Sequence, residues 1–184
     1  TYTCIASDNI DEGLSPTAWH DPDSDGSQDN PWQTVGKAYN QLLQLPAAGS
    51  IRFCSGGSLE IGQAGATWIY NPNCTAKHPC SVLDYTPPWA SGDEKRPLLT
   101  QNQAKQYGFR VDNNNGNWQE GYVFKNLRMH GFGTDAQAIY LSKVNHVTID
   151  NMEVDAFWTG VGMTDGDYIT LTNSVITNNS KQGY

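Results

Sequence analysis

The stretches VTIDNMEV at residues 147–154 and ITLTNSVI at residues 169–176 decide the fold, because the second repeats the pattern of the first. Both read apolar, Thr, apolar, polar, Asn, and then apolar again at the eighth position, and they lie 22 residues apart. The same step relates Ile139 to Val161. A fixed step that carries apolar residues and asparagine together indicates a structural repeat whose units stack on one another.

The repeat extends one unit towards the N-terminus with a longer step. Phe124, Asn126 and Met129 precede their counterparts in the 147–154 stretch by 25 residues. The three extra residues all fall between Met129 and Ile139. One loop of variable length therefore absorbs the whole difference.

A unit of about 22 residues has room for three short strands, each contributing to one of three parallel sheets. Inward side chains at equivalent positions would then form apolar stacks. The aligned asparagines are Asn126, Asn151 and Asn173. We expect them at a tight bend, because Asn tolerates the left-handed backbone and its amide can hydrogen-bond to the next Asn in the stack.

One helix signal precedes these repeats. Asp29 and Asn30 are capping residues, and Pro31 suits the first helical position. Apolar residues follow at helical spacing, so we expect an amphipathic helix from Pro31 to about Leu45. From Ile51 onward, short alternating apolar runs separated by turn residues predict strands.

These motifs resemble the pectate-lyase-like family of right-handed parallel β-helix proteins. The 147–154 and 169–176 stretches carry the resemblance. The run DGSQDNPWQT at 25–34 is similar to the entry into the capping helix of secreted members, and AGSIRF at 48–53 is similar to the first rung after that cap. The resemblance implies an all-β fold: a right-handed parallel β-helix with three sheets and an N-terminal capping α-helix.

We expect one domain over 1–184, with 1–46 as the N-terminal segment and cap and 47–184 as β-helix rungs. By the 22-residue step, residues 182–184 begin the first strand of another unit. An interrupted unit would expose strand edges and apolar core. We therefore expect either a native chain that continues beyond Tyr184 or an open C-terminal end covered by another molecule, such as another copy of this chain.

The charge of the chain excludes two classes of partner. There are 11 Lys and Arg against 19 Asp and Glu, which gives a net charge of −8. Nucleic acids and anionic membrane surfaces both require clustered positive charge, so neither is an expected partner. No apolar stretch approaches the roughly 20 residues that span a bilayer.

Four cysteines, Cys4, Cys54, Cys74 and Cys80, form an even set. Cys74 and Cys80 flank a short loop that is easy to bridge, which leaves Cys4 for Cys54. A zinc site is the rival interpretation, but there is no C-x-x-C pair and the histidines are scattered. Disulfides favour an oxidising compartment, so we expect a secreted protein.

Two further features suit a secreted chain. It begins at Thr1 rather than Met, as expected of a mature, processed N-terminus. Asn-x-Ser/Thr sequons at Asn73 and Asn178 would accept glycans in a eukaryotic source.

The acidic run DPDSDGSQD at 21–29 matches the first nine positions of a calcium loop. The carboxylates that would bind the ion are Asp21, Asp23, Asp25 and Asp29. Residue 12 of the loop is Trp32 rather than Glu, so the bidentate ligand is missing. The run predicts either a structural calcium site or an acidic surface loop whose last Asp caps the helix.

Outward positions on the expected first sheet, and the loops leading into it, hold residues suited to carbohydrate chemistry. A polysaccharide lyase needs a base and a cation beside the uronate carboxyl group. The candidate catalytic residues are Arg110, His130 and Lys181. The candidate substrate-binding residues are Tyr140, Asp155 and Trp158.

The same charged residues also have a simpler interpretation as cross-strand pairs on the surface. The pairs expected from the alignment are Lys125–Asp150, Arg128–Glu153 and His130–Asp155. The first sheet also lacks the acidic triplet of a calcium-dependent lyase and the Asp-Asp pair of a hydrolase.

Two classes of function remain open. The first is an extracellular carbohydrate-active protein of the polysaccharide-lyase or glycosidase type, acting on a polysaccharide or cell-surface glycan. The second is a structural or adhesive β-solenoid without catalysis, such as a subunit of an extracellular filament. A sugar-binding module without turnover is a third option.

Overall fold

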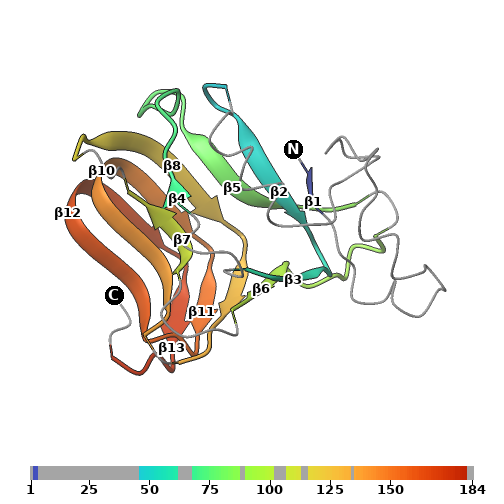
Figure 1. Ribbon diagram of the computed structural model, residues 1–184. Helices are drawn as coiled ribbons and strands as arrows, with labels where there is room; N and C mark the ends of the chain where they lie inside the picture. The colour runs from blue at the N-terminus through green and yellow to red at the C-terminus, as the bar shows by residue number, and fades with distance from the viewer. Residues whose placement is uncertain are drawn as a thin grey trace, which may run out of the picture.

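The computed structural model describes residues 2–3, 46–61, 68–87, 90–101, 107–112, 116–133 and 135–181, and all of the regular structure in them is β-strand (Figure 1). None of these residues is helical. Consequently no helix of these ranges is long and apolar enough to cross a membrane. The expected helix from Pro31 to Leu45 lies outside the described residues.

Within the described residues, the larger sheet has eight strands, every one of them paired in parallel. Their order is β1-β2-β5-β8-β10-β7-β4, with β12 also beside β10. The bounds are β1 Tyr2–Thr3, β2 Ser50–Cys54, β4 Trp68–Ile69, β5 Cys80–Tyr85, β7 Tyr107–Val111, β8 Gln119–Lys125, β10 Gln137–Asp150 and β12 Thr159–Thr172.

In the same part of the chain, the smaller sheet has five parallel strands in the order β13-β11-β9-β6-β3. Their bounds are β3 Ser58–Glu60, β6 Leu98–Thr100, β9 Arg128–His130, β11 Glu153–Asp155 and β13 Val175–Thr177. Figure 1 shows β3 and β6 below β2 and β5, and β11 and β13 beside the lower parts of the long strands β10 and β12. Residues 126–127, 151–152 and 173–174 carry the chain from the larger sheet to the smaller one.

The register confirms the repeat read from the sequence. Ile139 faces Val161 across β10 and β12, which is the 22-residue step. Met129 faces Val154 across β9 and β11, which is the 25-residue step. The difference lies in the connection 131–136, which is longer than its counterpart 156–158.

The expectation of three sheets is wrong. The two strands expected around Ile139 and Val147 are one continuous strand, β10, and their counterparts are one strand, β12. The backbone bends inside β10 at Lys143 and His146, where φ is 50° and 54°, and the equivalent positions of β12 also have positive φ. Because pairs such as Val144 and Gly166 continue the ladder through the bend, the two expected sheets are joined. In the described residues the fold is therefore all-β with parallel strands in two sheets, in place of a right-handed three-sheet β-helix.

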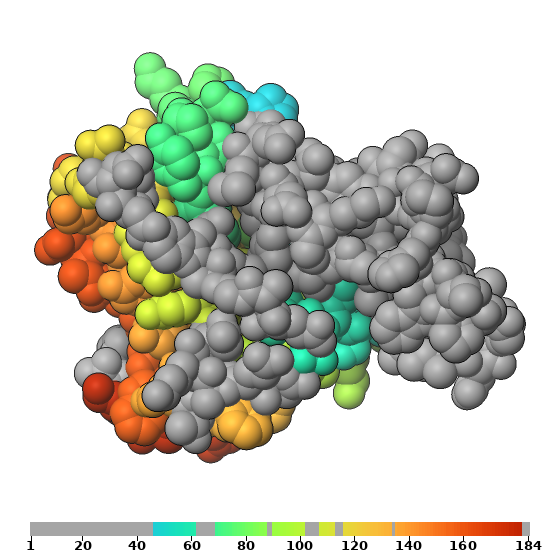
Figure 2. Space-filling model, viewed as in Figure 1, coloured from blue at the N-terminus to red at the C-terminus, as the bar shows by residue number. Residues whose placement is uncertain are grey.

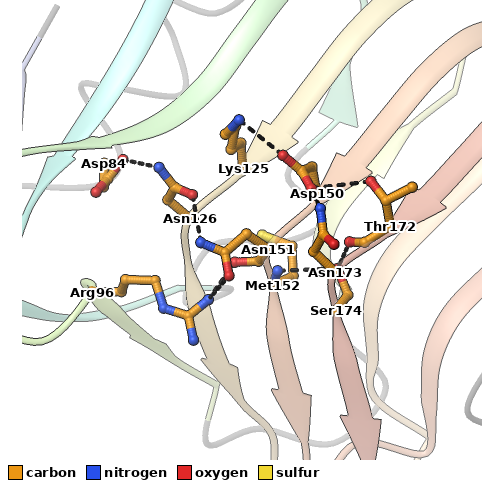
Figure 3. A network of polar contacts seen from close by, with 10 residues as sticks. All are labelled: Asp84, Arg96, Lys125, Asn126, Asp150, Asn151, Met152, Thr172, Asn173 and Ser174. Atoms are coloured by element: carbon orange, nitrogen blue, oxygen red, sulfur yellow. Dashed lines mark hydrogen bonds and ion pairs between the residues drawn. The ribbon is translucent and has the colours of Figure 1, made fainter.

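The expected asparagine bend is present where the chain passes between the sheets. Asn126, Asn151 and Asn173 all have positive φ, of 59°, 52° and 50°. The Asn151 side-chain amide donates to Asn126 Oδ1 at 2.8 Å, and Asn126 donates to Asp84 Oδ1 at 2.8 Å (Figure 3). Asn173 departs from this ladder, because its amide donates to Asp150 Oδ1 instead. The left-handed conformation that Asn tolerates thus recurs in each unit.

The core lies between the two sheets and follows the alternation of the strands. Buried positions include Phe109 and Phe124, whose ring centroids lie 5.2 Å apart, and Leu99 of the smaller sheet. The buried Tyr122 hydroxyl donates to Gln119 Oε1 at 2.7 Å, so its polar atom is satisfied inside the core. In the space-filling view, the segments coloured green to red pack directly against one another (Figure 2).

Candidate functional site

An open groove of about 470 Å³ runs over the outer face of the smaller sheet. Its lining comes from four neighbouring strands, β6, β9, β11 and β13. Side chains alternate between the two faces of a strand, so Met129 and Val154 point into the core while the residues beside them point outward. The groove is thus a direct product of the strand alternation and the parallel register.

Two ionic rows form the centre of this groove. Strand β9 presents Arg128 and His130, and strand β11 presents Glu153 and Asp155. The register places Arg128 beside Glu153 and His130 beside Asp155. Neighbouring strands lie about 4.8 Å apart, so a row of cationic or imidazole groups faces a row of carboxylates at contact distance.

Uncharged side chains flank these rows. Leu98 of β6 lies on one side, and Val175 and Thr177 of β13 lie on the other. Val175 is 54% exposed, which is high for a valine. The groove therefore combines hydrogen-bonding groups with accessible apolar surface.

The predicted pair of His130 and Asp155 is confirmed. His130 Nδ1 lies 3.0 Å from Asp155 Oδ1, and both side chains are about half exposed. In the sequence, His130 is a candidate catalytic residue and Asp155 is a candidate substrate-binding residue. The structure brings the two together in the groove.

Glu153 does not pair with its register partner Arg128, contrary to the expectation from the alignment. It forms an ion pair with Arg96, which lies just before β6. Arg96 also donates to the Asn151 carbonyl oxygen and, at 3.0 Å, to Asn151 Oδ1. Arg128 instead donates through Nε to the Arg96 carbonyl oxygen at 2.9 Å. Arg96 therefore contacts both rows of the groove.

Arg110 and Tyr140 lie together on the larger sheet, as expected of outward positions of neighbouring strands. The Arg110 guanidinium lies 5.0 Å from the centre of the Tyr107 ring and 5.6 Å from that of Tyr140, and it pairs with Asp112 at 2.5 Å. The Tyr140 hydroxyl donates to Thr164 Oγ1 at 3.4 Å. Arg110 is thus held within a cluster of aromatic and acidic groups.

Lys181 and Trp158 form a third cluster. The Lys181 ammonium lies 5.4 Å from the centre of the Trp158 ring, a cation–π contact. Its backbone N–H also donates to the Trp158 carbonyl oxygen at 2.9 Å. This contact ties the segment after β13 to the start of β12.

The candidate residues thus fall into three pairs rather than one constellation. Each pair joins one candidate catalytic residue to one candidate substrate-binding residue. Within the described residues, no hydrogen bond, ion pair or ring contact connects the three pairs to one another. Only the pair of His130 and Asp155 lines the groove.

A second polar network surrounds the asparagine bend (Figure 3). Lys125 Nζ lies 2.8 Å from Asp150 Oδ2, which confirms the predicted cross-strand pair of Lys125 and Asp150. Asp150 also accepts hydrogen bonds from Asn173 and Thr172. Lys125, with these two donors, lowers the pKa of Asp150 to about 2, and Asp150 raises the pKa of Lys125. This network stabilises the strand ends and lies outside the lining of the groove.

The other predicted sites have mixed outcomes. The disulfide between Cys74 and Cys80 is present. Cys54 is also disulfide-bonded, and its expected partner Cys4 lies outside the described residues. Both sequon asparagines, Asn73 and Asn178, are exposed.

The calcium prediction falls on Asp21, Asp23, Asp25 and Asp29, which lie outside the described residues. In the part of the chain that the structure does describe, no group of three or more His, Cys, Asp or Glu side chains is arranged to hold a metal ion.

Arg96 is the residue of the groove that sequence reasoning missed. It belongs to none of the aligned units, so the repeat pattern gives no position for it. The nearest sequence signal is the excess of local turn residues around it, such as Ser91 and Gly92, whose backbone N–H groups bond to Glu94. Those contacts fix the loop and say nothing of where Arg96 points.

Compared with known proteins, the chain matches no family model, no curated protein and no solved structure. The resemblance to the pectate-lyase-like family therefore stays a prediction from the sequence motifs.

Proposed function

We propose that this protein is an extracellular carbohydrate-active protein that binds a glycan chain in the groove over the smaller sheet. The observation that carries the proposal is the lining of that groove, where Arg128 and His130 face Glu153 and Asp155. Sugar hydroxyls both donate and accept hydrogen bonds. A surface with charged donors and acceptors side by side therefore suits them.

Two further features support the proposal. Leu98 and Val175 provide apolar surface on which the C–H face of a sugar ring can rest. The disulfide between Cys74 and Cys80 suits an oxidising, extracellular compartment.

Binding is better supported than cleavage. Glycoside hydrolysis uses two carboxyl groups that flank the scissile bond, and Glu153 and Asp155 occupy alternate positions of one strand face. Each of them, however, is already engaged by a basic side chain, Arg96 or His130. A general acid has to release a proton to the leaving group, and a carboxylate held by a base is poorly placed to do so.

The test is calorimetric titration of the full chain with a panel of oligosaccharides. We expect saturable binding that Asp155→Asn and His130→Ala each weaken about tenfold, since each changes or removes a hydrogen-bonding side chain of the groove. Lys77→Ala, which removes an exposed charge outside the groove, is the matched control and should bind as the parent does. Binding that survives both groove variants would exclude this site, and no binding to any oligosaccharide would end the proposal.

Turnover is measured in the same samples. Reducing ends report hydrolysis, and the absorbance of unsaturated uronates reports a lyase. Binding without either signal is the expected result for a binding protein. Product formation that is lost in Asp155→Asn would instead show that the groove is an active site.

A second function, self-association, is favoured by the last strands. Among the described residues, β12 pairs only with β10, and β13 only with β11. Met163, Tyr168 and Val175 on these strands are all more than half exposed. We propose that copies of the chain associate through this edge, since a long unpaired strand edge recruits other strands. Sedimentation should show concentration-dependent association that Met163→Lys reduces, whereas a monomer at every concentration would contradict it.

A further inference from the structure

Arg128 has an obvious partner that it does not use. The register places it directly beside Glu153 on the neighbouring strand, and oppositely charged side chains in that position usually pair. Glu153 is bound by Arg96 instead. The sequence alignment predicts a pair of Arg128 and Glu153, and the structure replaces it with a different one.

Arg96 has the contacts needed to hold this arrangement. Its guanidinium spans Glu153 and the Asn151 carbonyl and side-chain oxygens, so it is fixed at several points. Its own carbonyl oxygen accepts the Nε–H of Arg128 at 2.9 Å. Arg96 therefore binds the Glu153 carboxylate that would otherwise pair with Arg128. Its carbonyl oxygen also holds the Nε–H end of the Arg128 guanidinium.

The two terminal amino groups of the Arg128 guanidinium donate no hydrogen bond to another described residue. Within the described part of the chain, the bond from Nε to Arg96 is the one hydrogen bond that Arg128 donates, and it takes part in no ion pair. Arg128 lines the groove and is partly buried. A planar guanidinium fork in such a place matches a planar or tetrahedral oxyanion, because it can donate two parallel hydrogen bonds.

We infer that the groove selects a ligand bearing an oxyanion, a carboxylate or a sulfate ester, through Arg128, and that Arg96 is the positioning residue that keeps Arg128 available. This inference rests on the proposed glycan-binding function and narrows its ligand class. The anion would lie over β9, and the remainder of the sugar would extend towards His130 and Asp155.

The test compares three oligosaccharides of equal length: a neutral one, one with uronate residues and one with sulfate esters. We expect the parent protein to bind at least one anionic oligosaccharide about 10- to 100-fold more tightly than the neutral one, as charged hydrogen bonds of this kind imply. The two anionic ligands separate a carboxylate from a sulfate. Equal binding of all three would overturn the inference and leave the proposed function standing, whereas no binding of any would overturn the proposed function.

Arg128→Ala should abolish the preference, so that the anionic and the neutral oligosaccharides bind about equally, because the group that donates to the anion is gone. Lys77→Ala removes the same charge outside the groove and should keep the preference. A preference that survives Arg128→Ala would assign the anion to another residue and overturn the inference.

Arg96 is tested by rescue. In Arg96→Ala, Glu153 is released and can pair with Arg128. The anionic oligosaccharide should then bind at most about threefold more tightly than the neutral one. The double variant Arg96→Ala, Glu153→Gln has no carboxylate to capture Arg128, and the preference should return. Damage to the fold would not be repaired by that second change. Failure of the rescue in a protein that still binds the neutral oligosaccharide would therefore overturn the positioning role.

Discussion

The unit of β10 and β11 and the unit of β12 and β13 share one sequence pattern, yet only the first is buried. Ile149 is 0% exposed, while its register partner Leu171 is 40% exposed. Val154 is 1% exposed, while Ile176 is only partly buried. An apolar residue in this fold is buried by the units on both sides of it, and the described part of the chain gives the last unit a neighbour on one side only.

The polar contacts show the same contrast. Asn151 bonds to the equivalent Asn126 of the preceding unit, whereas Asn173 bonds to Asp150. Asn151 additionally holds Arg96. Asp150 also accepts hydrogen bonds from Thr172 and Asn173, so the inner unit is held by both the preceding and the following unit. Within the described residues, the outer unit has such contacts with the preceding unit alone.

The largest test of this contrast is a pair of truncations. Ile149→Ala should lower the free energy of unfolding by about 2–5 kcal/mol, because it leaves a cavity between two packed units. Leu171→Ala removes a similar side chain from the same position of the last unit and should cost roughly 1 kcal/mol or less. Denaturant unfolding of both variants gives the comparison, and equal costs would show that the last unit is covered in solution.

Two glycines provide the next test. A Cβ at Gly131 would lie 2.5 Å from the Phe157 ring, which is buried and cannot move aside. A Cβ at Gly162 would lie 2.5 Å from Gln137 Oε1, the far end of a flexible side chain. We expect Gly131→Ala to cost about 1–3 kcal/mol and Gly162→Ala less than about 1 kcal/mol. A thermal melt in which Gly162→Ala is the more damaging would contradict the contacts described for these two glycines.

The asparagines follow at a smaller scale. Asn151→Ala loses the bond to Asn126 and places alanine at a φ of 52°, so we expect a loss of about 1–2 kcal/mol. Asn151→Gly restores the backbone freedom and should recover part of that loss. Asn173→Ala is the matched change in the last unit, and equal losses at the two positions would argue against a ladder.

Acid stability gives the smallest effect. The unfolded chain protonates Asp150 near its ordinary pKa of about 3.9, whereas the folded chain does so at about 2. The unfolded state therefore binds more protons between these values, and stability falls as the pH is lowered through this window. Asp150→Asn should flatten the dependence of Tm on pH between about 4 and 2. Asp93→Asn, an exposed carboxylate outside the network, is the control.

The sequence predicted the register of the last units because apolar residues and asparagines recur together. The apolar residues recur because equivalent positions of successive units stack in the core, and the asparagines recur because each unit has the same left-handed bend. Both requirements restrict the residue type at a fixed position, so both can be seen in the sequence. It did not predict that the expected first and second sheets join. Polar residues at Lys143 and Asp165 resemble turn residues, but a positive φ at these positions bends the strand without breaking its ladder.

The groove was predictable to the extent that it follows from the register. The pair of His130 and Asp155 was read from the alignment and is confirmed. The role of Arg96 could not be predicted from the sequence, because its partner Glu153 lies 57 residues further along the chain and no repeat relates the two positions. Long contacts from a connecting loop depend on how that loop is placed, which local sequence does not specify.

The connection at 131–136 adjoins His130 and is three residues longer than 156–158, and the strands on both sides still pair in register. Length can therefore change at this point without disturbing the strands. The strands that line the groove and the connection that adjoins His130 can therefore vary independently. New ligand preferences could be acquired by exchanging one short segment, and engineered insertions there would be tolerated for the same reason.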